Sequence, residues 1–459
     1  MKNNILLNTD SYKASHWLQY PAGTENVFSY IESRGGKFDK TVFFGLQMFL
    51  KEYLTTPITQ EMIDEADKFI GAHIGPGIFN REGWEYILKR YGGYLPVRIK
   101  AVPEGMIIPV HNVLVTIEAT DPKCFWLTSF LETALVRSVW YPTTVATISW
   151  NIKQVIKRYL TETGDVNLLP FRLHDFGSRG VSSFESAGIG GAAHLVNFMG
   201  TDTITGVVFA MKYYNTEMPG FSIPAAEHST ITTFGKEGEV EAFRNMLRQF
   251  AKPGSLVAVV SDSYDIFNAV DNIWGKELKQ EVIDSGATVI VRPDSGDPTS
   301  VVLKVVQSLD NSFGSTINDK GYKVLNHVRV IQGDGINENT IREILETLKA
   351  NSYSASNMAF GMGGMLLQGL NRDTQKFAMK ASAVKINGKW IPVSKDPVTD
   401  PGKRSKAGRL ELIRLATGEI KTVAIEDSFG HELLLKPVFA DGLVLKEWTF
   451  TEVRENITK

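Results

Sequence analysis

Four short β-branched runs in the second half of the chain each end in a small polar loop, and a helical pattern follows each loop at once. These loops occupy residues 261–263, 292–296, 332–335 and 360–364. Strand–loop–helix units that repeat every roughly 30 to 40 residues stack as parallel strands with their C-terminal loops on one face. The polar loops should therefore converge on one site, which predicts a barrel enzyme that acts on a phosphorylated ligand.

Composition places the chain among large globular proteins and excludes some partners. The 459 residues, 43% of them hydrophobic and 22% charged, can bury a large core and predict two or more domains. A net charge of -2 provides no positive field for a polyanion, so we expect no nucleic-acid partner. Cys124 is the only cysteine, which excludes an internal disulfide and favours a reducing, cytoplasmic compartment. We find no signal-peptide core and no apolar run near membrane-spanning length, and therefore expect no membrane association.

The character of the sequence changes twice along the chain. An amphipathic helix at 60–74 and strand-like stretches at 95–102 and 113–117 are followed by a helix from about 146 to 160. The repeated units begin near residue 173, with strands expected at 256–260, 288–291, 328–331 and 358–360. After residue 373 strands return without intervening helices, at 381–385, 390–393, 410–414, 422–425 and 443–448.

We therefore predict an α/β protein in which an irregular TIM-like α/β barrel at 161–373 carries the site. Residues 1–160 and 374–459 should form one discontinuous α+β domain with an antiparallel sheet and dimer contacts. The helices of the barrel are well specified by local signals. Asp297 is an expected N-cap followed by proline at the first helical position, and Ile341, Ile344, Leu345 and Leu348 have the spacing of one helix face.

The loop tips carry the residue types that bind phosphate and ribose. Gly363 and Gly364 join a strand to a helix, where exposed backbone N–H groups suit a phosphate monoester, although paired glycines also form ordinary tight turns. Arg292, Asp294 and Asp334 add a guanidinium and carboxylates to the same rim. Such residues also serve as caps or surface ion pairs, but acidic tips on consecutive strands indicate ribose binding or a magnesium shell.

A second cluster lies upstream. Phe176 and Arg179 follow the first strand of the barrel phase and should face the same rim, Phe176 as a stacking surface and nearby Asp202 as a hydrogen-bond acceptor. His228 stands beside Glu227 at the start of a short helical stretch. A single histidine is more often structural than functional, and its position after a strand-like stretch favours function here.

Together these blocks resemble the nicotinamide phosphoribosyltransferases, which belong to the type II phosphoribosyltransferase family. The resemblance rests on residues 8–16, 174–191, 200–203, 224–230, 260–265, 292–296, 332–335 and 395–397, in the family's order and over nearly the whole chain. It implies transfer of the 5-phosphoribosyl group from phosphoribosyl pyrophosphate to nicotinamide in NAD salvage. The products are nicotinamide mononucleotide and pyrophosphate, with Mg²⁺ as the cofactor.

The resemblance also implies roles for individual residues. The nicotinamide ring would lie between Phe176 and Tyr12 of the second subunit of a homodimer, with Arg292 beside it and Asp202 accepting a hydrogen bond from the carboxamide. An acidic acceptor repels nicotinate, so the amide should be preferred. The resemblance assigns phosphate, pyrophosphate and ribose contacts to Arg179, Asp10, Gly333, Asp334, Gly363, Gly364, Arg372, Arg34, Lys380, Lys395 and Lys403.

The expected catalytic group comprises His228, Asp294, Asp262 and Glu227. In the family the histidine is phosphorylated by ATP as a co-substrate, which couples ATP hydrolysis to transfer, and Glu227 and Asp262 would orient it. The departures from the family pattern are Ala378 for a serine, Ser178 for a tyrosine, and a shorter stretch after Gly36. The short loop and Met362 indicate a bacterial or viral relative.

Three alternatives to this assignment exist. A nicotinate phosphoribosyltransferase has a related fold, and turnover of the amide and the acid distinguishes the two enzymes. A noncatalytic binding or signalling protein on the same scaffold is disfavoured by the intact set of Asp202, His228, Arg292 and Asp294. An aldolase or isomerase barrel would need a buried lysine or a catalytic glutamate at a strand end, and the strand tips carry neither.

Overall fold

The computed structural model describes residues 4–399 and 404–458. The chain forms two compact units: the sheet unit comprises Met1–Thr147, Lys212–Thr216 and Asn371–Lys459, and the barrel unit comprises Ile148–Met211 and Glu217–Leu370. Within the described ranges, no helix has the length and apolar character needed to cross a bilayer.

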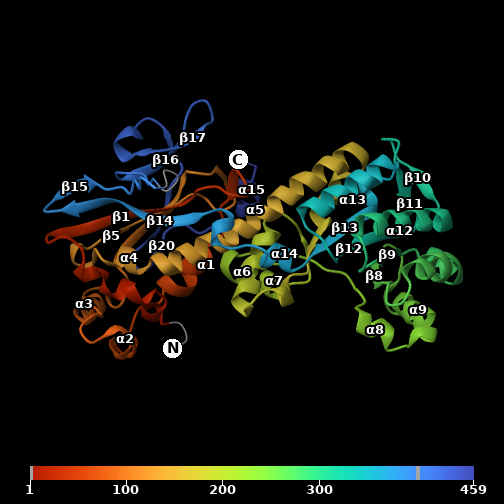
Figure 1. Ribbon diagram of the computed structural model, residues 1–459, viewed down its shortest axis with the longest axis horizontal. Coiled ribbons are helices and arrows are strands. Elements are labelled where there is room, and N and C mark those ends of the chain that lie inside the picture. The colour runs from red at the N-terminus through yellow and green to blue at the C-terminus, as the bar shows by residue number, and fades with distance from the viewer. Residues whose placement is uncertain (1–3, 400–403, 459) are drawn as a thin grey trace. The chain divides into compact units, whose positions relative to one another are not determined.

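The barrel unit is built on six parallel strands in the order β7-β6-β13-β12-β9-β8 (Figure 1). An extended segment at residues 221–226 connects the two edges of this sheet. The Thr201 amide donates to the Phe221 carbonyl at 3.0 Å, and the Ala226 amide donates to the Ala258 carbonyl at 2.9 Å. The strands therefore close into a ring with fewer regular strands than a TIM barrel, which confirms the predicted irregular α/β barrel. The strands are β6 (Leu173–Asp175), β7 (Gly200–Thr201), β8 (Leu256–Val260), β9 (Thr288–Arg292), β12 (Val328–Gln332) and β13 (Met358–Met362).

Inside this ring, small and branched side chains form a narrow apolar layer. Ala258, Ile290, Ile331 and Ala359 pack together, each from a different strand, and Phe176 covers them in part. Successive side chains of a strand alternate between faces. The residue two positions after each of these core residues therefore also points inward, nearer the carboxyl end of its strand. This alternation directs Arg292 inward, two residues after Ile290, toward the mouth of the barrel.

Helices cover the outside of the ring. The predicted cap of α12 (Pro298–Phe313) is confirmed, because the Asp297 carboxylate accepts a hydrogen bond from the Ser300 amide at 2.9 Å. The predicted one-face residues of α13 (Glu338–Ala350) are all buried, and α13 packs beside α12 (Figure 1). The other helices of the unit include α6 (Phe184–Leu195), α7 (Ile204–Tyr214), α8 (His228–Thr232), α9 (Glu239–Phe250), α10 (Ile266–Asn268), the π-helix η8 (Ala269–Glu277), α11 (Lys279–Ser285) and α14 (Gly364–Leu367).

The sheet unit joins the two ends of the sequence in one seven-stranded sheet, ordered β15-β14-β1-β5-β3-β19-β20. All of its pairings are antiparallel, as expected from the return of strands without helices. These strands are β1 (Thr24–Ser33), β3 (Val97–Ala101), β5 (Val113–Ala119), β14 (Phe377–Ile386), β15 (Lys389–Pro392), β19 (Lys436–Ala440) and β20 (Leu443–Val444). A separate sheet contains β16 (Leu410–Arg414), β17 (Ile420–Ala424) and β18 (Glu432–Leu433).

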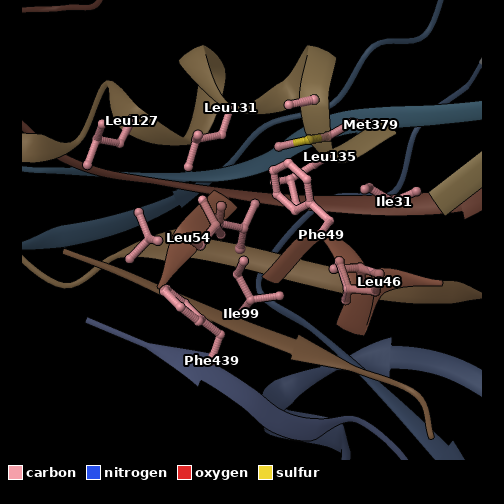
Figure 2. Close-up of a cluster of buried hydrophobic side chains, with 14 of the residues drawn as sticks. Ile31, Leu46, Phe49, Leu54, Ile99, Leu127, Leu131, Leu135, Met379 and Phe439 are labelled. Atoms are coloured by element: carbon pink, nitrogen blue, oxygen red, sulfur yellow. The ribbon is translucent and has the colours of Figure 1, made fainter. Parts of the chain in front are cut away.

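The core of the sheet unit lies between its seven-stranded sheet and its helices. Figure 2 shows Leu127, Leu131 and Leu135 pointing from the helices toward the strands that carry Ile31 and Ile99. The predicted helix at 60–74 is α2 (Gln60–Ile74), and α3 (Arg81–Tyr91) packs against it.

One helix differs from expectation. We predicted a helix from about residue 146, whereas α5 runs from Glu132 to Thr163 and includes Pro142. A proline removes one helical hydrogen bond and normally ends a helix. Here the Pro142 ring fills the space above Gly45, where a Cβ atom would lie 2.3 Å from Pro142 Cγ, and the Thr144 hydroxyl donates to the Trp140 carbonyl at 2.6 Å. The carbonyl that loses its helical donor is that of Ser138, four residues before Pro142, and the helix continues through the proline with its ring packed on Gly45. The division between the two units falls within this helix.

Candidate active site

A cavity of about 740 Å³ opens at the carboxyl ends of the parallel strands. Of the four loops predicted to converge, those after β9 and β12 line it, together with the upstream loops after β6 and β7. The loops after β8 and β13, both within the described residues, contribute no residue to its lining. The cavity is lined by Phe176, Ser178, Arg179, Asp202, Thr203, Glu227, His228, Ser229, Arg292, Asp294, Gly333 and Asp334. It therefore combines one aromatic ring, two guanidinium groups and four carboxylates.

Phe176 forms the floor of the cavity. A Cβ atom on Gly361 would lie 1.9 Å from Phe176 Cε2, and one on Gly333 would lie 3.4 Å from it. The Phe176 amide donates to the Met362 carbonyl at 3.0 Å. The ring therefore rests on the backbone of the neighbouring strands, where it offers an aromatic surface for a planar ligand.

Asp202 stands on the wall beside this floor. Its amide donates to the Asp175 carbonyl at 3.0 Å, and its carboxylate accepts a hydrogen bond from the Ser222 hydroxyl. Asp175 itself is fully buried, and its carboxylate accepts from the Gly177 amide at 2.7 Å. Burial raises the pKa of Asp175 to about 6, and the charge of Asp202 contributes to this shift. The wall is therefore acidic and suits an N–H donor on the ligand.

His228 begins α8 and is held between two kinds of partner. Its Nε2 atom lies 3.6 Å from Asp262 Oδ1 and 3.7 Å from Asp294 Oδ2, whereas its Nδ1 atom lies 3.2 Å from the Ser263 hydroxyl. Asp294 Oδ2 also lies 3.5 Å from an Arg292 nitrogen. The side chain of His228 is 47% exposed and lines the cavity, so the ring is accessible to a ligand.

Glu227 is one of the two expected orienting carboxylates, with Asp262. It lines the cavity and accepts a hydrogen bond from the Ser229 hydroxyl. The carboxylates beside the imidazole ring are those of Asp262 and Asp294. Asp262 is 5% exposed, and its Oδ1 atom is buried without a hydrogen-bond partner among the described residues.

Gly363 and Gly364 lie next to the floor, at the start of the four-residue helix α14. A Cβ atom on Gly180 would lie 2.9 Å from Gly364 Cα, so the two loop backbones are in direct contact. This contact excludes a side chain at Gly180, whereas a Cβ atom on Gly364 would lie at an ordinary contact distance of 3.8 Å from the Gly180 carbonyl oxygen. Since α14 spans about one turn, its dipole is weaker than that of a longer helix.

Several predicted phosphate ligands lie in the sheet unit, around a second cavity of about 250 Å³. Asp10, Arg372, Lys380 and Ala378 line it, with Arg137 and Glu132. Burial lowers the pKa of Lys380; the carboxylate of Glu132 opposes this effect, and the cations of Arg34, Lys395 and Lys13 add to it. These charges therefore form a basic cluster.

The remaining residues of the predicted set differ in accessibility. Arg34 forms an ion pair with Glu32 at 3.0 Å, and the side chain of Lys395 is exposed. Tyr12, in η2 (Ser11–Leu18), is 59% exposed. Lys403 lies outside the described residues.

Some contacts of the site were not anticipated from the sequence. The Ser222 hydroxyl donates to Asp202, and the Ser229 hydroxyl donates to Glu227. The Ser263 hydroxyl lies beside His228 Nδ1, and Thr203 lines the cavity. Ser263 was visible as the residue after Asp262 in the same loop tip. Ser222 lies in the extended segment that closes the barrel, within the predicted strand-like stretch at 221–223, and its contact with Asp202 spans 20 residues of sequence.

The site is equipped to bind a planar ring and an anionic group together. An aromatic floor and an acidic wall suit a heteroaromatic amide, and Arg179 and Arg292 suit phosphate oxygens. Among the described residues, no group of three or more histidine, cysteine or carboxylate side chains could hold a metal ion without help from a ligand.

Comparisons with known proteins agree with these features. The model of the nicotinate phosphoribosyltransferase (NAPRTase) family matches residues 171–443, and the model of the nicotinamide phosphoribosyltransferase N-terminal domain matches residues 4–99. A nicotinamide phosphoribosyltransferase from Xanthomonas campestris pv. campestris is 58% identical, over 98% of this chain and 97% of the relative. Another from Acinetobacter baylyi is 32% identical, over 99% and 97%.

Two solved structures share the fold at low sequence identity. A nicotinate-nucleotide pyrophosphorylase from Pyrococcus furiosus aligns with a TM-score of 0.65 and 17% identity, over 100% of this chain and 96% of the other. Human nicotinic acid phosphoribosyltransferase aligns with a TM-score of 0.54 and 16% identity, over 98% and 92%.

Proposed function

The chain belongs to the nicotinate phosphoribosyltransferase family, and from this premise we propose how its cavity works. The enzyme transfers the 5-phosphoribosyl group from phosphoribosyl pyrophosphate to nicotinamide, which gives nicotinamide mononucleotide and pyrophosphate in NAD salvage. One observation carries the assignment of residues. A single cavity brings the Phe176 ring, the Asp202 carboxylate and the guanidinium groups of Arg179 and Arg292 together.

In this reaction the pyridine nitrogen forms a bond to ribose C1 while the bond from C1 to the pyrophosphate oxygen breaks. The nucleophile is neutral, so no base has to remove a proton from it. The enzyme must hold both reactants in line and stabilise charge on the leaving group. We assign ring stacking to Phe176 and phosphate binding to Arg179 and Arg292, while Gly333 and Asp334 face the ribose.

Asp202 is our candidate for selecting the amide over the acid. Its carboxylate lies on the cavity wall and already accepts a hydrogen bond from Ser222, so a second donor such as a carboxamide N–H is well matched. A nicotinate carboxylate at the same place would meet a like charge.

The test is turnover of nicotinamide and nicotinate with phosphoribosyl pyrophosphate, with product identification. We expect the ratio of kcat/KM values to favour the amide, and Asp202→Ser to reduce that ratio by about tenfold or more, equivalent to about 1.4 kcal/mol. Asp284→Ser, which removes an exposed carboxylate on α11, should leave the ratio unchanged. Equal or better use of nicotinate by the unsubstituted enzyme would identify it as a nicotinate phosphoribosyltransferase. Absence of turnover of either substrate would favour the noncatalytic alternative.

We also propose that His228 accepts a phosphoryl group from ATP. A proton on Nε2 is favoured because that atom faces the carboxylates of Asp262 and Asp294. The lone pair of Nδ1 then accepts a hydrogen bond from the Ser263 hydroxyl, and it attacks phosphorus once that hydroxyl rotates away. In this step the P–N bond forms as the bond to the ADP oxygen breaks, and later hydrolysis of the phosphohistidine drives the overall transfer.

Replacing His228 by alanine tests this coupling. We expect His228→Ala to keep a slow basal transfer that ATP no longer stimulates, because substrate contacts remain while the phosphoryl acceptor is lost. His431→Ala removes an exposed histidine outside both cavities and should keep full stimulation. Stimulation of His228→Ala by ATP, or complete loss of activity in a folded protein, would contradict the proposed role.

The carboxylates near His228 also suit magnesium. Mg²⁺ usually takes one or two protein carboxylates together with substrate phosphates and water. Asp262 fits such a site, because its buried Oδ1 atom has no hydrogen-bond partner among the described residues, and Asp294 lies beside the same imidazole. When bound, the ion would neutralise charge on the pyrophosphate. We therefore propose Asp262 and Asp294 as candidate ligands.

We propose a homodimer with shared sites. The resemblance assigns ligand contacts to Tyr12 and to the basic cluster of the sheet unit, and Tyr12 is well exposed. The barrel unit also exposes the apolar side chains of Phe184, Ile204 and Val208. We further propose a cytoplasmic location, which fits a chain whose only cysteine is the buried thiol of Cys124.

A further inference from the structure

Beneath Phe176, two glycines occupy positions where the alternation of side chains along a barrel strand would place an inward-pointing side chain. Ile331 and Ala359 point into the barrel core. Gly361 lies two residues further along β13, and Gly333 directly follows the last residue of β12, so both continue the same alternation toward the interior. Glycine inside a strand is unfavourable, and it often marks the close approach of another group.

The backbone does not require glycine at either position. Gly361 and Gly333 are absent from the positive-φ residues of the chain, so an alanine could adopt the same backbone conformation. At Gly361, what excludes a side chain is Phe176. A Cβ atom on Gly361 would lie 1.9 Å from Phe176 Cε2 and 2.2 Å from Cδ2, far inside van der Waals contact. At Gly333 a Cβ atom would first meet Asp294 Oδ1 at 3.1 Å, with Phe176 Cε2 at an ordinary contact distance of 3.4 Å.

The backbone of Phe176 is held on both sides and cannot retreat from such a clash. Its amide donates to the Met362 carbonyl at 3.0 Å, and the following Gly177 amide donates to the buried Asp175 carboxylate at 2.7 Å. A Cβ atom on Gly177 would in turn lie 2.6 Å from Leu367 Cγ. A methyl group at position 361 must therefore move the ring, and the open direction is the cavity.

We propose that Gly361 is a positioning residue that seats the Phe176 ring and so sets the depth at which the pyridine binds. This inference rests on the proposed role of Phe176 as the stacking surface. It adds a specificity determinant that touches no substrate. A one-carbon change at Gly361 acts on the pyridine pocket through Phe176, whereas the phosphate-binding groups stay in place.

The experiment compares Gly361→Ala with the unsubstituted enzyme. We expect KM for nicotinamide to rise by about tenfold or more, while KM for phosphoribosyl pyrophosphate stays within about twofold. Gly164→Ala is the matched control. Its methyl group would meet Ser356 Oγ at 2.5 Å, before the amino ends of β6 and β13 and away from the cavity. It should cost stability without changing the ratio of the two KM values. An unchanged KM for nicotinamide in folded Gly361→Ala would overturn the proposal.

A second variant identifies the ring as the cause. In Phe176→Leu the ring that clashes is gone, so adding Gly361→Ala should raise KM for nicotinamide by much less than it does in the unsubstituted enzyme. If Gly361→Ala fails to fold and Gly361→Ala/Phe176→Leu folds, the clash with the ring is supported. The proposal fails if neither variant folds. It also fails if the effects of Gly361→Ala and Phe176→Leu on KM for nicotinamide simply multiply in the double variant, because Gly361 is then needed for another reason.

Failure of the proposed function is recognised separately. An unsubstituted enzyme that uses nicotinate in place of nicotinamide would overturn the substrate assignment alone. The same comparison of KM values, made with nicotinate, then tests the seating of Phe176.

Discussion

Asp175 is the residue whose chemistry differs most from its ordinary behaviour at this site. It is fully buried at the end of β6, directly before the Phe176 floor, and its carbonyl accepts the Asp202 amide. Burial, the largest cause, raises its pKa from 3.8 to about 6. Ionisation of Asp175 therefore opposes folding, and the fold tolerates this because the carboxylate fixes the turn at Gly177.

The sign of this effect gives a prediction for stability. Below the unfolded pKa of 3.8, Asp175 is protonated in both the folded and the unfolded protein and costs no stability. The destabilisation grows as pH rises and reaches its full size above the folded pKa of about 6. Asp175→Asn is neutral at every pH and can still accept from the Gly177 amide. The variant's advantage in unfolding free energy over the unsubstituted protein should therefore be about 1 kcal/mol larger at pH 7.5 than at pH 5. Urea unfolding at the two pH values measures this, and a difference that falls with pH would refute the assignment.

At the scale of elements, the site depends on loops that are fixed by the first turns of the following helices. The loop that carries Gly333 and Asp334 leads into α13, whose start is a capping box. The Asn337 carboxamide oxygen accepts from the Asn339 and Thr340 amides at 2.9 and 3.2 Å, and the Thr340 hydroxyl accepts from the Asn337 amide at 2.9 Å. Local hydrogen bonds therefore hold the end of this loop.

Removing the cap should loosen the element. We expect Asn337→Ala to lower the free energy of unfolding by about 1 kcal/mol, because two backbone donors lose their acceptor. Asn337→Asp keeps an acceptor at the same place and should cost much less. Urea unfolding of both variants provides the comparison, and equal losses in the two would show that the cap contributes little.

At the scale of the whole molecule, the predicted ligand contacts are divided between two cavities. The aromatic floor, the acidic wall and His228 belong to the barrel unit, whereas Arg372, Lys380 and Asp10 line the cavity of the sheet unit. A homodimer would allow the sheet unit of one chain to complete the barrel site of the other. Subunit mixing can test this arrangement.

Mixing Tyr12→Ala chains with Phe176→Ala chains should restore activity. If each site takes Tyr12 from one chain and Phe176 from the other, half the dimers are mixed and each has one intact site. Roughly a quarter of the wild-type activity should then return. Asp202→Ala mixed with Phe176→Ala is the control, because both residues line the cavity of the same barrel unit and no intact site can form. Lack of recovery with Tyr12→Ala, once subunit exchange is verified, would exclude sharing.

Much of the barrel could be predicted because its signals are local. The predicted strands became β8, β9, β12 and β13 almost at the predicted limits, and the cap at Asp297 was correctly placed. Prediction failed where a distant contact overrides a local preference. Pro142 lies inside a continuous helix, where its ring packs on Gly45, and no local signal showed that the strand-like stretch at 221–223 belongs to a segment that bridges two sheet edges.

The sequence alone determined the strands and the polar character of the loops that follow them, because side-chain alternation and capping operate over a few residues. Resemblance of its motifs identified the chemistry. Only the tertiary structure decided the strand order, the ring closure and the seating of Phe176 on Gly361, since these contacts join residues far apart in the chain. A glycine in the sequence records that a side chain is missing, and the fold reveals which neighbouring group occupies its space.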